Sequence, residues 1–296
     1  MDRIEGVYVA TATPFNQEGE LETTHYLKLL ESLHKAGVDG FVPLGTTGEM
    51  ATLSESEKKE LIQLTLQFAK PLGKRVMVGC GGPDTKRVME SIDYAATQGA
   101  DSVLVVTPYY NRPTPRGVKE HYHFLADRSP IPIILYHIPI RTALTLSADN
   151  IIDILAHPKM AGIKESSGSY ALWLELSCRL DLSQKSLLAG DDDALALMLA
   201  LGGSGIIAAG GNVAPAPFVK MYRQAKRGEW AAVFAEQKKL SPFVKSMFLE
   251  TNPAPIKYAL SKVLGWKNCL RLPLVSVTQE TSERIDSVLK AMELVR

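Results

Sequence analysis

The lysine at position 164 is the side chain whose setting most suggests covalent chemistry. Lys164 ends an apolar run, residues 160–163, whereas most other lysines lie in polar stretches such as Lys58-Lys59. Burial disfavours the charged ammonium, so the free amine of Lys164 becomes available to attack a carbonyl carbon. A structural ion pair with Glu165 or Asp191 is the alternative. Position alone does not choose between the two interpretations.

Hydroxyl groups at neighbouring positions favour the chemical interpretation. Imine formation between an amine and a keto group needs proton transfers, which tyrosine hydroxyls can relay. Tyr136 ends the apolar run before that of Lys164, and Tyr109-Tyr110 follow the run before that. One tyrosine alone would be read as a packing residue, but three near adjacent strand ends indicate a relay.

Two further features suit the binding of carboxylates. The turn Gly45-Thr46-Thr47-Gly48 offers hydroxyl and backbone N–H groups near an expected helix start. Arg141 follows Tyr136 by five positions, and a guanidinium is a two-pronged partner for a carboxylate. A solvated surface charge is the alternative for Arg141.

These residues need a scaffold that brings strand ends together. Short β-rich runs alternate with helix-length segments up to about residue 225, and most of the runs are continuously apolar, as in parallel strands buried on both faces. Eight strands in series predict a closed (β/α)8 TIM barrel, with the site at the C-terminal ends of its strands. The expected strands are 7–14, 40–44, 75–80, 102–107, 131–138, 162–164, 186–189 and 205–209.

The expected helices carry recognisable start and stop signals. Ser54 with Glu57 matches a capping box, and Gly37 and Gly99 stand where helices must stop before a strand. Residues 229–248, 254–264 and 276–293 read as three more helices. We therefore expect residues 1–228 to form the barrel and 229–296 a C-terminal helical extension packed on it. Helices expected within the barrel include 23–35, 55–68, 85–97 and 147–156.

The composition narrows the possible partners and compartment. The 296 residues carry a formal net charge of +1 with dispersed basic residues, which argues against nucleic acid. Three scattered cysteines fit neither a disulfide framework nor a zinc site and favour a reducing cytoplasm. The first five residues lack the apolar core of a signal peptide, and no run long enough to span a membrane occurs. We expect no metal and no dinucleotide cofactor.

Taken in order along the chain, five motifs resemble those of a family of class I pyruvate-dependent aldolases, which includes dihydrodipicolinate synthase and N-acetylneuraminate lyase. The likeness extends over essentially the whole chain. Its motifs are Gly45-Thr46-Thr47-Gly48-Glu49, Thr107-Pro108-Tyr109-Tyr110-Asn111, Tyr136-His137-Ile138-Pro139, Gly162-Ile163-Lys164-Glu165 and Gly190-Asp191-Asp192.

The resemblance implies a role for each site residue. Lys164 would form an imine with pyruvate, and Thr47, with backbone groups near it and at Ile207, would hold the pyruvate carboxylate; Gly190 would also line the substrate site. Tyr136, Thr46 and Tyr110 would relay protons, with Tyr110 reaching in from a second subunit of a homodimer or homotetramer.

Within the family, the double threonine, Arg141-Thr142 and the tail segments resemble the synthase branch. That branch condenses pyruvate with L-aspartate 4-semialdehyde in lysine and diaminopimelate biosynthesis, and Arg141 would bind the carboxylate of the semialdehyde. The tail segments are Asn252-Pro253-Ala254-Pro255-Ile256-Lys257 and Leu270-Arg271-Leu272-Pro273.

Two other functions stay open at this point. A sibling aldolase would act on N-acetylneuraminate or a 2-keto-3-deoxy sugar acid, but such polyhydroxylated substrates call for hydroxyl-bonding residues in place of Arg141. A catalytically silent keto-acid sensor would need no nucleophile, so the intact Lys164, Tyr136 and Tyr110 argue against it.

The chain also departs from the family pattern. His137 stands where asparagine is common, Ile140 where a small residue is usual, and Gly210-Gly211 also differ. In lysine-inhibited members the regulatory cleft carries a histidine, an asparagine and a glutamate. The matching positions here are Glu55 (or Lys58 for a second histidine), Pro83 and Arg87. Because an arginine would repel the lysine ammonium, we predict weak or absent inhibition by lysine.

Overall fold

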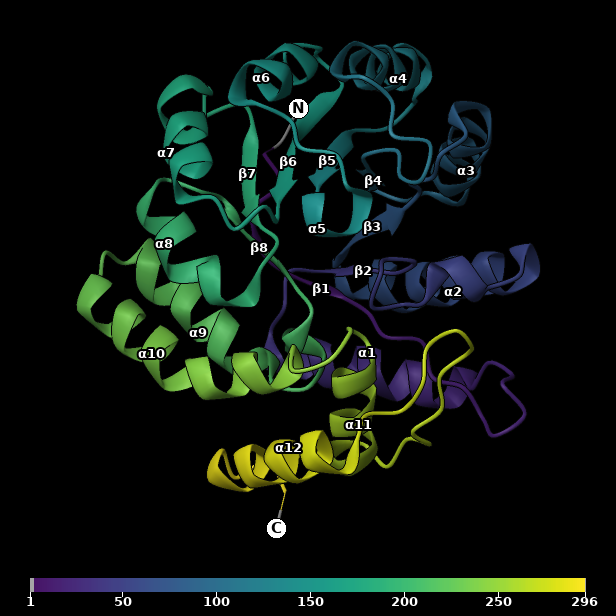
Figure 1. Ribbon diagram of the computed structural model, residues 1–296, viewed down its shortest axis with the longest axis vertical. Coiled ribbons are helices and arrows are strands. Elements are labelled where there is room, and N and C mark those ends of the chain that lie inside the picture. Colours follow the sequence, from purple (N-terminus) through teal and green to yellow (C-terminus); the bar gives the residue numbers. More distant parts are fainter. Residues whose placement is uncertain (1–2, 296) are drawn as a thin grey trace.

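The computed structural model describes residues 3–295, so residues 1, 2 and 296 of the two expected segments lie outside the described part. Eight parallel strands close into a barrel in which each strand pairs with its neighbours in chain order and β1 pairs with β8 (Figure 1). The predicted (β/α)8 fold is confirmed. The strands are β1 Gly6–Ala10, β2 Gly40–Val42, β3 Arg75–Gly79, β4 Ser102–Val106, β5 Ile133–His137, β6 Met160–Glu165, β7 Ser186–Ala189 and β8 Gly205–Ala208.

The strands are buried on both faces, which explains why they read as continuous apolar runs. Their outward side chains pack with the surrounding helices in one large core. Their inward side chains form a second, smaller core within the barrel, so the interior is packed rather than open. The inward cluster includes Tyr8, Val42, Met77, Leu104, Ile134, Tyr136, Leu188 and Ile207.

Helices surround the barrel and begin and end where the sequence signals them. Ser54 forms the expected capping box with Glu57, and Gly37 and Gly99 end their helices in the left-handed conformation. The helices are α1 Thr23–Ala36, α2 Glu55–Ala69, α3 Thr85–Gln98, α4 Pro115–Arg128, α5 Pro139–Thr142, α6 Ala148–Leu155, α7 Tyr170–Arg179, α8 Leu195–Ala200, α9 Pro215–Lys226, α10 Trp230–Met247, α11 Ala254–Val263 and α12 Gln279–Ala291, with 3-10 turns at Met50–Thr52, Lys70–Leu72, Asp192–Ala194 and Gly210–Asn212.

The first two strands are shorter than predicted: the chain after β1 makes its contacts with loops, and Leu44, after β2, is left-handed with φ of 61°. The expected strand 7–14 ends at Ala10, after which the Ala12 N–H donates to Asn212 Oδ1 at 2.9 Å and Thr13 Oγ1 donates to the Gly48 carbonyl at 2.7 Å. The expected strand 40–44 ends at Val42. These polar contacts to loops replace ladder hydrogen bonds.

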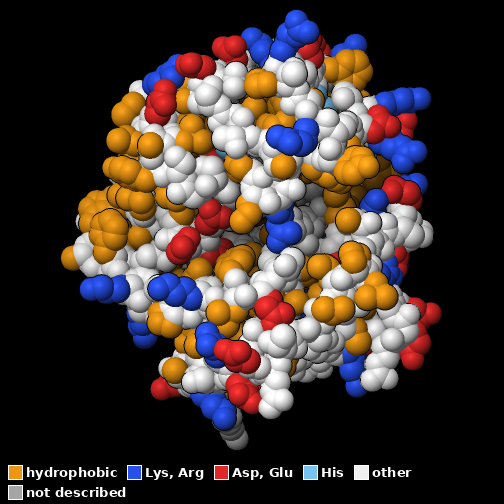
Figure 2. Space-filling model, viewed as in Figure 1, with side chains coloured by type: hydrophobic (Ala, Val, Ile, Leu, Met, Phe, Trp, Pro, Cys, Tyr) orange, Lys and Arg blue, Asp and Glu red, His pale blue; other side chains and the backbone are white. Residues whose placement is uncertain are grey.

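The last three helices lie together at one side of the barrel. α10 contacts α8 and α9, and α11 and α12 pack with α10 beside the α1 edge (Figure 1, green to yellow). The three helices expected after residue 228 are present, while their status as a separate extension stays a prediction. Acidic and basic side chains are interspersed over the face shown in Figure 2. Within residues 3–295, no helix is long and apolar enough to cross a bilayer.

Candidate active site

Lys164 lies in β6 at the mouth of the barrel and is only 5% exposed. Parallel pairing of β5 with β6 places Tyr136 directly beside it. The Lys164 Nζ lies 4.2 Å from the centre of the Tyr136 ring. A buried amine next to a phenol has the arrangement needed for nucleophilic attack with an adjacent proton donor.

A glycine leaves the room that this lysine needs. Gly190 follows β7, and a Cβ atom placed on it would lie 3.1 Å from Lys164 Cε and would collide with Ser166 Oγ. Any larger residue would therefore collide with Ser166 and the Glu165 carbonyl and would crowd the lysine side chain. Ile207, on β8, is fully buried in the inward cluster that also contains Tyr136.

Behind Lys164, the buried carboxylate of Glu165 is surrounded by uncharged donors. His137 Nδ1 lies 2.8 Å from Glu165 Oε1, the Ser167 N–H donates to the same oxygen at 3.0 Å, and Trp173 Nε1 donates to the other oxygen. His137 Nε2 accepts from the Leu146 N–H at 3.1 Å, so Nδ1 carries the proton. The histidine thereby ties β5 to the loop after Arg141.

Burial raises the pKa of the two aspartates that follow β7. Desolvation raises the pKa of Asp191 to about 6, opposed by the charge of Lys164. Burial likewise raises the pKa of Asp192 to about 6, although its oxygens accept backbone N–H groups from Ala209 at 3.0 Å and Gly210 at 2.5 Å. Asp192 thus fixes the turn after β8, and a Cβ on Gly210 would approach its Oδ2 to 2.7 Å.

The turn that carries Thr46 and Thr47 lies after β2. Within the predicted turn Gly45–Gly48, the Gly48 N–H is not available to a ligand because it donates inside the turn. The Gly48 and Glu49 N–H groups donate within the turn, to the Gly45 and Thr46 carbonyls, each at 3.1 Å. A short 3-10 turn follows, and α2 begins only at Glu55. The carboxylate-binding role of this turn therefore stays a prediction that depends on the Thr46 and Thr47 side chains and on the backbone groups near them.

Glu49, directly after this turn, forms a buried ion pair with Lys257 of α11. Its backbone is left-handed, with φ of 52°, and its carboxylate accepts from Lys257 Nζ at 2.6 Å and from the Arg271 N–H at 3.1 Å. Both side chains of the pair are fully buried. Burial lowers the pKa of Lys257, and the charge of Glu49 opposes that shift. Because a buried charge needs a partner, Glu49 and Lys257 depend on each other.

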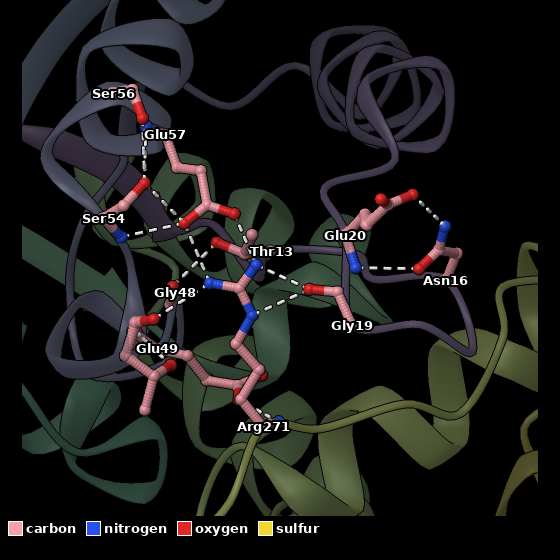
Figure 3. Close-up of polar contacts among 11 residues, drawn as sticks. Thr13, Asn16, Gly19, Glu20, Gly48, Glu49, Ser54, Ser56, Glu57 and Arg271 are labelled. Atoms are coloured by element: carbon pink, nitrogen blue, oxygen red, sulfur yellow. Dashed lines mark hydrogen bonds and ion pairs between the residues drawn. The ribbon is translucent and has the colours of Figure 1, made fainter.

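Arg271 holds the C-terminal segment against the same turn and the loop before α1 (Figure 3). Its guanidinium donates to the Gly19 carbonyl at 2.9 Å, to the Thr52 carbonyl at 2.9 Å, and to both carboxylate oxygens of Glu57. The hydrogen bond from Arg271 lowers the pKa of Glu57 to about 2. One guanidinium therefore joins three segments that are distant in the sequence.

Arg141 and Thr47 are linked through Asn252, which lies between α10 and α11. Asn252 Nδ2 donates to Thr47 Oγ1 at 3.0 Å, and Arg141 Nη2 donates to the Asn252 carbonyl at 3.2 Å. Tyr110 is 93% exposed, with a left-handed backbone at φ of 71°, and so does not pack into the site of its own chain. Within the described residues, no group of three or more His, Cys, Asp or Glu side chains could hold a metal ion.

Comparison with known proteins identifies the family to which the chain belongs. Residues 3–292 match the model of the dihydrodipicolinate synthetase family. The chain belongs to this family. It is 39% identical to the 4-hydroxy-tetrahydrodipicolinate synthase of Leptospira biflexa serovar Patoc over 94% of each chain.

Two solved structures show the same fold. The dihydrodipicolinate synthase of Thermotoga maritima superimposes with a TM-score of 0.96 at 33% identity, over 99% of this chain and 100% of that one. The enzyme from Acinetobacter baumannii, in complex with pyruvate, gives a TM-score of 0.95 at 30% identity, with the same coverage. The resemblance to the family read from the five motifs is thus confirmed.

The four positions compared with the family's regulatory cleft fall in one cavity of the structure. A cleft of about 870 Å³ between α2 and α3 is lined by Glu55, Lys58, Pro83 and Arg87. Lys58 pairs with Glu55 at 2.7 Å, and Arg87 lies 3.6 Å from Asp84. The cavity also reaches Tyr109, the neighbour of Tyr110, but not Lys164.

Sequence reasoning gave no role to the residues that support the threonine turn. Asn252, Lys257 and Arg271 served only to mark the resemblance to the synthase branch of the family. Their partners Thr47 and Glu49 lie more than 200 positions away. The available signal was the placement of Lys257 among apolar residues of the helix 254–263, much as Lys164 follows an apolar run.

Proposed function

We propose that the chain condenses pyruvate with L-aspartate 4-semialdehyde to give 4-hydroxy-tetrahydrodipicolinate, through an imine on Lys164. This is the reaction named for its curated relatives, and it places the chain in lysine and diaminopimelate biosynthesis. The observation that carries the proposal is the buried Lys164 amine beside Tyr136. Two side chains suited to carboxylates, Thr47 and Arg141, are linked to each other through Asn252.

The reaction begins with attack of the Lys164 amine on the keto carbon of pyruvate. Nζ forms a bond to that carbon and water leaves, which gives a protonated imine. Loss of a proton from the methyl group then gives an enamine. Tyr136 is the adjacent hydroxyl for these proton transfers, and Thr46 with Tyr110 of a second copy extends the relay. The exposure of Tyr110 supports an assembly that is at least a homodimer, and we propose a homotetramer.

The enamine carbon next attacks the aldehyde carbon of the semialdehyde, and the resulting alkoxide takes up a proton. The amino group of the semialdehyde portion then attacks the imine carbon. A new carbon–nitrogen bond closes the ring as the bond to Nζ breaks, so the lysine amine is regenerated. No oxidant, reductant or metal is consumed, and we propose that the enzyme needs no cofactor.

Binding of the two carboxylates is assigned to residues of the threonine turn, of β8 and of α5. Thr47, with backbone groups near it and at Ile207, holds the carboxylate of pyruvate, while Gly190 leaves space beside it. Arg141 binds the carboxylate of the semialdehyde as a bidentate donor. A structural relative in complex with pyruvate supports the first substrate. We place the enzyme in the cytoplasm, where its three free cysteines stay reduced.

The decisive experiment is borohydride reduction in the presence of pyruvate, followed by mass spectrometry of the peptide that contains Lys164. A stable adduct on Lys164 is expected, and its absence would refute the imine mechanism. The second substrate is tested by comparing condensation with the semialdehyde against cleavage of N-acetylneuraminate and 2-keto-3-deoxy sugar acids. A faster reaction with either sugar acid would overturn the assignment to the synthase reaction.

Arg141→Ala tests the second carboxylate site. Loss of a charge-assisted, bidentate contact should raise the KM for the semialdehyde by about ten- to a hundredfold, with a small effect on the KM for pyruvate. Arg141→Lys keeps the positive charge but loses the two-pronged guanidinium. Its KM for the semialdehyde should lie between that of the unmodified protein and that of Arg141→Ala. If Arg141→Ala left the semialdehyde reaction intact, the role of Arg141 would be wrong.

A further inference from the structure

Asn252 contacts both side chains assigned to carboxylate binding. It lies in the segment between α10 and α11 and is only 7% exposed. Its side chain reaches Thr47 and its backbone carbonyl accepts from Arg141, at the distances given above. The residue therefore connects the pyruvate and semialdehyde halves of the proposed site.

The hydrogen bond to Thr47 has a definite direction. A side-chain NH2 group can only donate, so Thr47 Oγ1 is the acceptor in this contact. The single hydroxyl proton of Thr47 then stays free to be donated to another group. A carboxylate of a bound keto acid is an acceptor that this proton suits.

The side chain of Asn252 is poorly explained as a structural residue. Its Oδ1 is buried and has no hydrogen-bond partner among the described residues. A buried asparagine that serves the fold normally has both ends of its amide satisfied. The contact with Thr47 is its only side-chain hydrogen bond among those described, so the amide is specified by the threonine.

The backbones on both sides of this contact are fixed by other residues. Glu49 stands two positions after Thr47, and Lys257 five positions after Asn252, and these two form the buried ion pair. The ion pair thus holds the two segments together independently of the Asn252 side chain. Replacement of that side chain should change the direction of the threonine hydroxyl without separating the segments.

We propose that Asn252 is a positioning residue that orients the Thr47 hydroxyl as a donor toward the carboxylate of the keto acid. Its backbone carbonyl holds Arg141 by a contact that does not depend on the side chain. This inference rests on the proposed function, because Thr47 must be the pyruvate-binding residue. It adds a residue of the C-terminal region to the recognition of the first substrate.

A double-mutant cycle with Asn252→Ala and Thr47→Val tests the proposal. Each single variant should raise the KM for pyruvate about fivefold, the effect of one lost hydrogen bond. The double variant should be no worse than Thr47→Val, because Asn252 acts through the hydroxyl that Thr47→Val removes. Effects that multiply to about twenty-five-fold would overturn the proposal.

Substrate selectivity separates positioning from a general loss of structure. Asn252→Ala keeps the backbone carbonyl, so the KM for the semialdehyde and kcat should change less than twofold. Equal increases in both KM values would contradict the proposal. Asn252→Asp is nearly isosteric and serves if the alanine variant does not fold. Its carboxylate takes the hydroxyl proton of Thr47 and repels pyruvate, so its KM for pyruvate should rise more than in Asn252→Ala; an unchanged KM would overturn the inference.

Borohydride trapping of the unmodified protein separates failure of the imine mechanism from failure of the role proposed for Asn252. No adduct with pyruvate on Lys164 overturns both the proposed function and the role of Asn252. An adduct on Lys164 together with multiplicative effects in the cycle overturns the role of Asn252 alone. An adduct together with a non-additive cycle supports both.

Discussion

The two sides of the barrel mouth hold their functional groups by different means. Lys164 and Tyr136 lie on adjacent strands, and Glu165 behind them is surrounded by uncharged donors. On the loop side, Thr47 follows β2 and Arg141 lies in the short helix α5, and the Glu49 carboxylate, two positions after Thr47, depends on the ammonium of Lys257. The residues proposed for the covalent chemistry are thus held by strand pairing, while those proposed for carboxylate binding are held by polar contacts between segments distant in the sequence.

The largest expected effect is at the strand side. Lys164→Ala should lower kcat/KM for condensation by at least about 10⁴-fold and abolish the borohydride adduct, since no other group there can form the imine. Lys238→Ala, an exposed lysine of α10, is the matched control and should retain full activity. Residual trapping at another lysine would show that the nucleophile has been misassigned.

The two buried glutamates, Glu49 and Glu165, should differ in how much stability is lost when one partner is removed. Lys257→Met leaves Glu49 charged, buried and unpaired, and should lower the free energy of unfolding by about 3–5 kcal/mol. Trp173→Phe removes one of several neutral donors to Glu165 and should cost about 1–3 kcal/mol. Urea denaturation measures both changes. Equal losses would mean that the two carboxylates are held alike, and recovery in Lys257→Met with Glu49→Gln would confirm the unpaired charge as the cause.

On the loop side, acid should weaken the contact between Glu57 and Arg271. Arg271 lowers the pKa of Glu57 from 4.5 to about 2. Because the folded pKa lies below the unfolded value, this stabilisation is present above pH 4.5 and is lost as the pH falls toward about 2. Glu57→Gln should lower Tm at pH 7 by about 2–4 °C, and the difference should shrink in acid. A constant difference between pH 7 and pH 3 would contradict this.

On the strand side, the pH dependence of stability should have the opposite sign, because the pKa of Asp191 is raised instead of lowered. Burial raises the pKa of Asp191 from 3.8 to about 6. The folded state therefore binds the extra proton between these values, and the resulting stabilisation is lost as the pH rises through about 6. Asp191→Asn should gain about 1–3 °C in Tm relative to the unmodified protein between pH 4 and pH 7. A relative loss over that range would show that the Lys164 charge outweighs burial.

The smallest expected effect is that of added lysine on activity, at the cleft between α2 and α3, which lies apart from both sides of the barrel mouth. Arg87 and Lys58 line it, and their charges should repel the lysine ammonium. We expect weak or no inhibition by lysine, measured as initial rates of condensation with lysine added. Half-inhibition below 1 mM would contradict this prediction. Arg87→Glu tests the cause, since a carboxylate there should increase any inhibition.

Much of the strand side was predictable because its contacts are local or follow from strand pairing. A lysine at the end of an apolar strand and a tyrosine on the preceding strand become neighbours once the barrel closes in chain order. His137 was noticed as a departure from the family pattern, but its contacts with Glu165 and Leu146 were not foreseen. The strands β1 and β2 were predicted too long, because contacts with loops and the left-handed Leu44 end them early.

The eight-stranded barrel, the strand position of Lys164 and the family could be predicted from the sequence alone, because hydrophobic periodicity, capping residues and motifs are local properties of the chain. Only the tertiary structure decided how Asn252, Lys257 and Arg271 support the threonine turn. The physical reason is that a buried polar group takes whichever partner the packed fold brings within about 3 Å. Over a separation of 205 residues, no periodicity in the sequence encodes that partner.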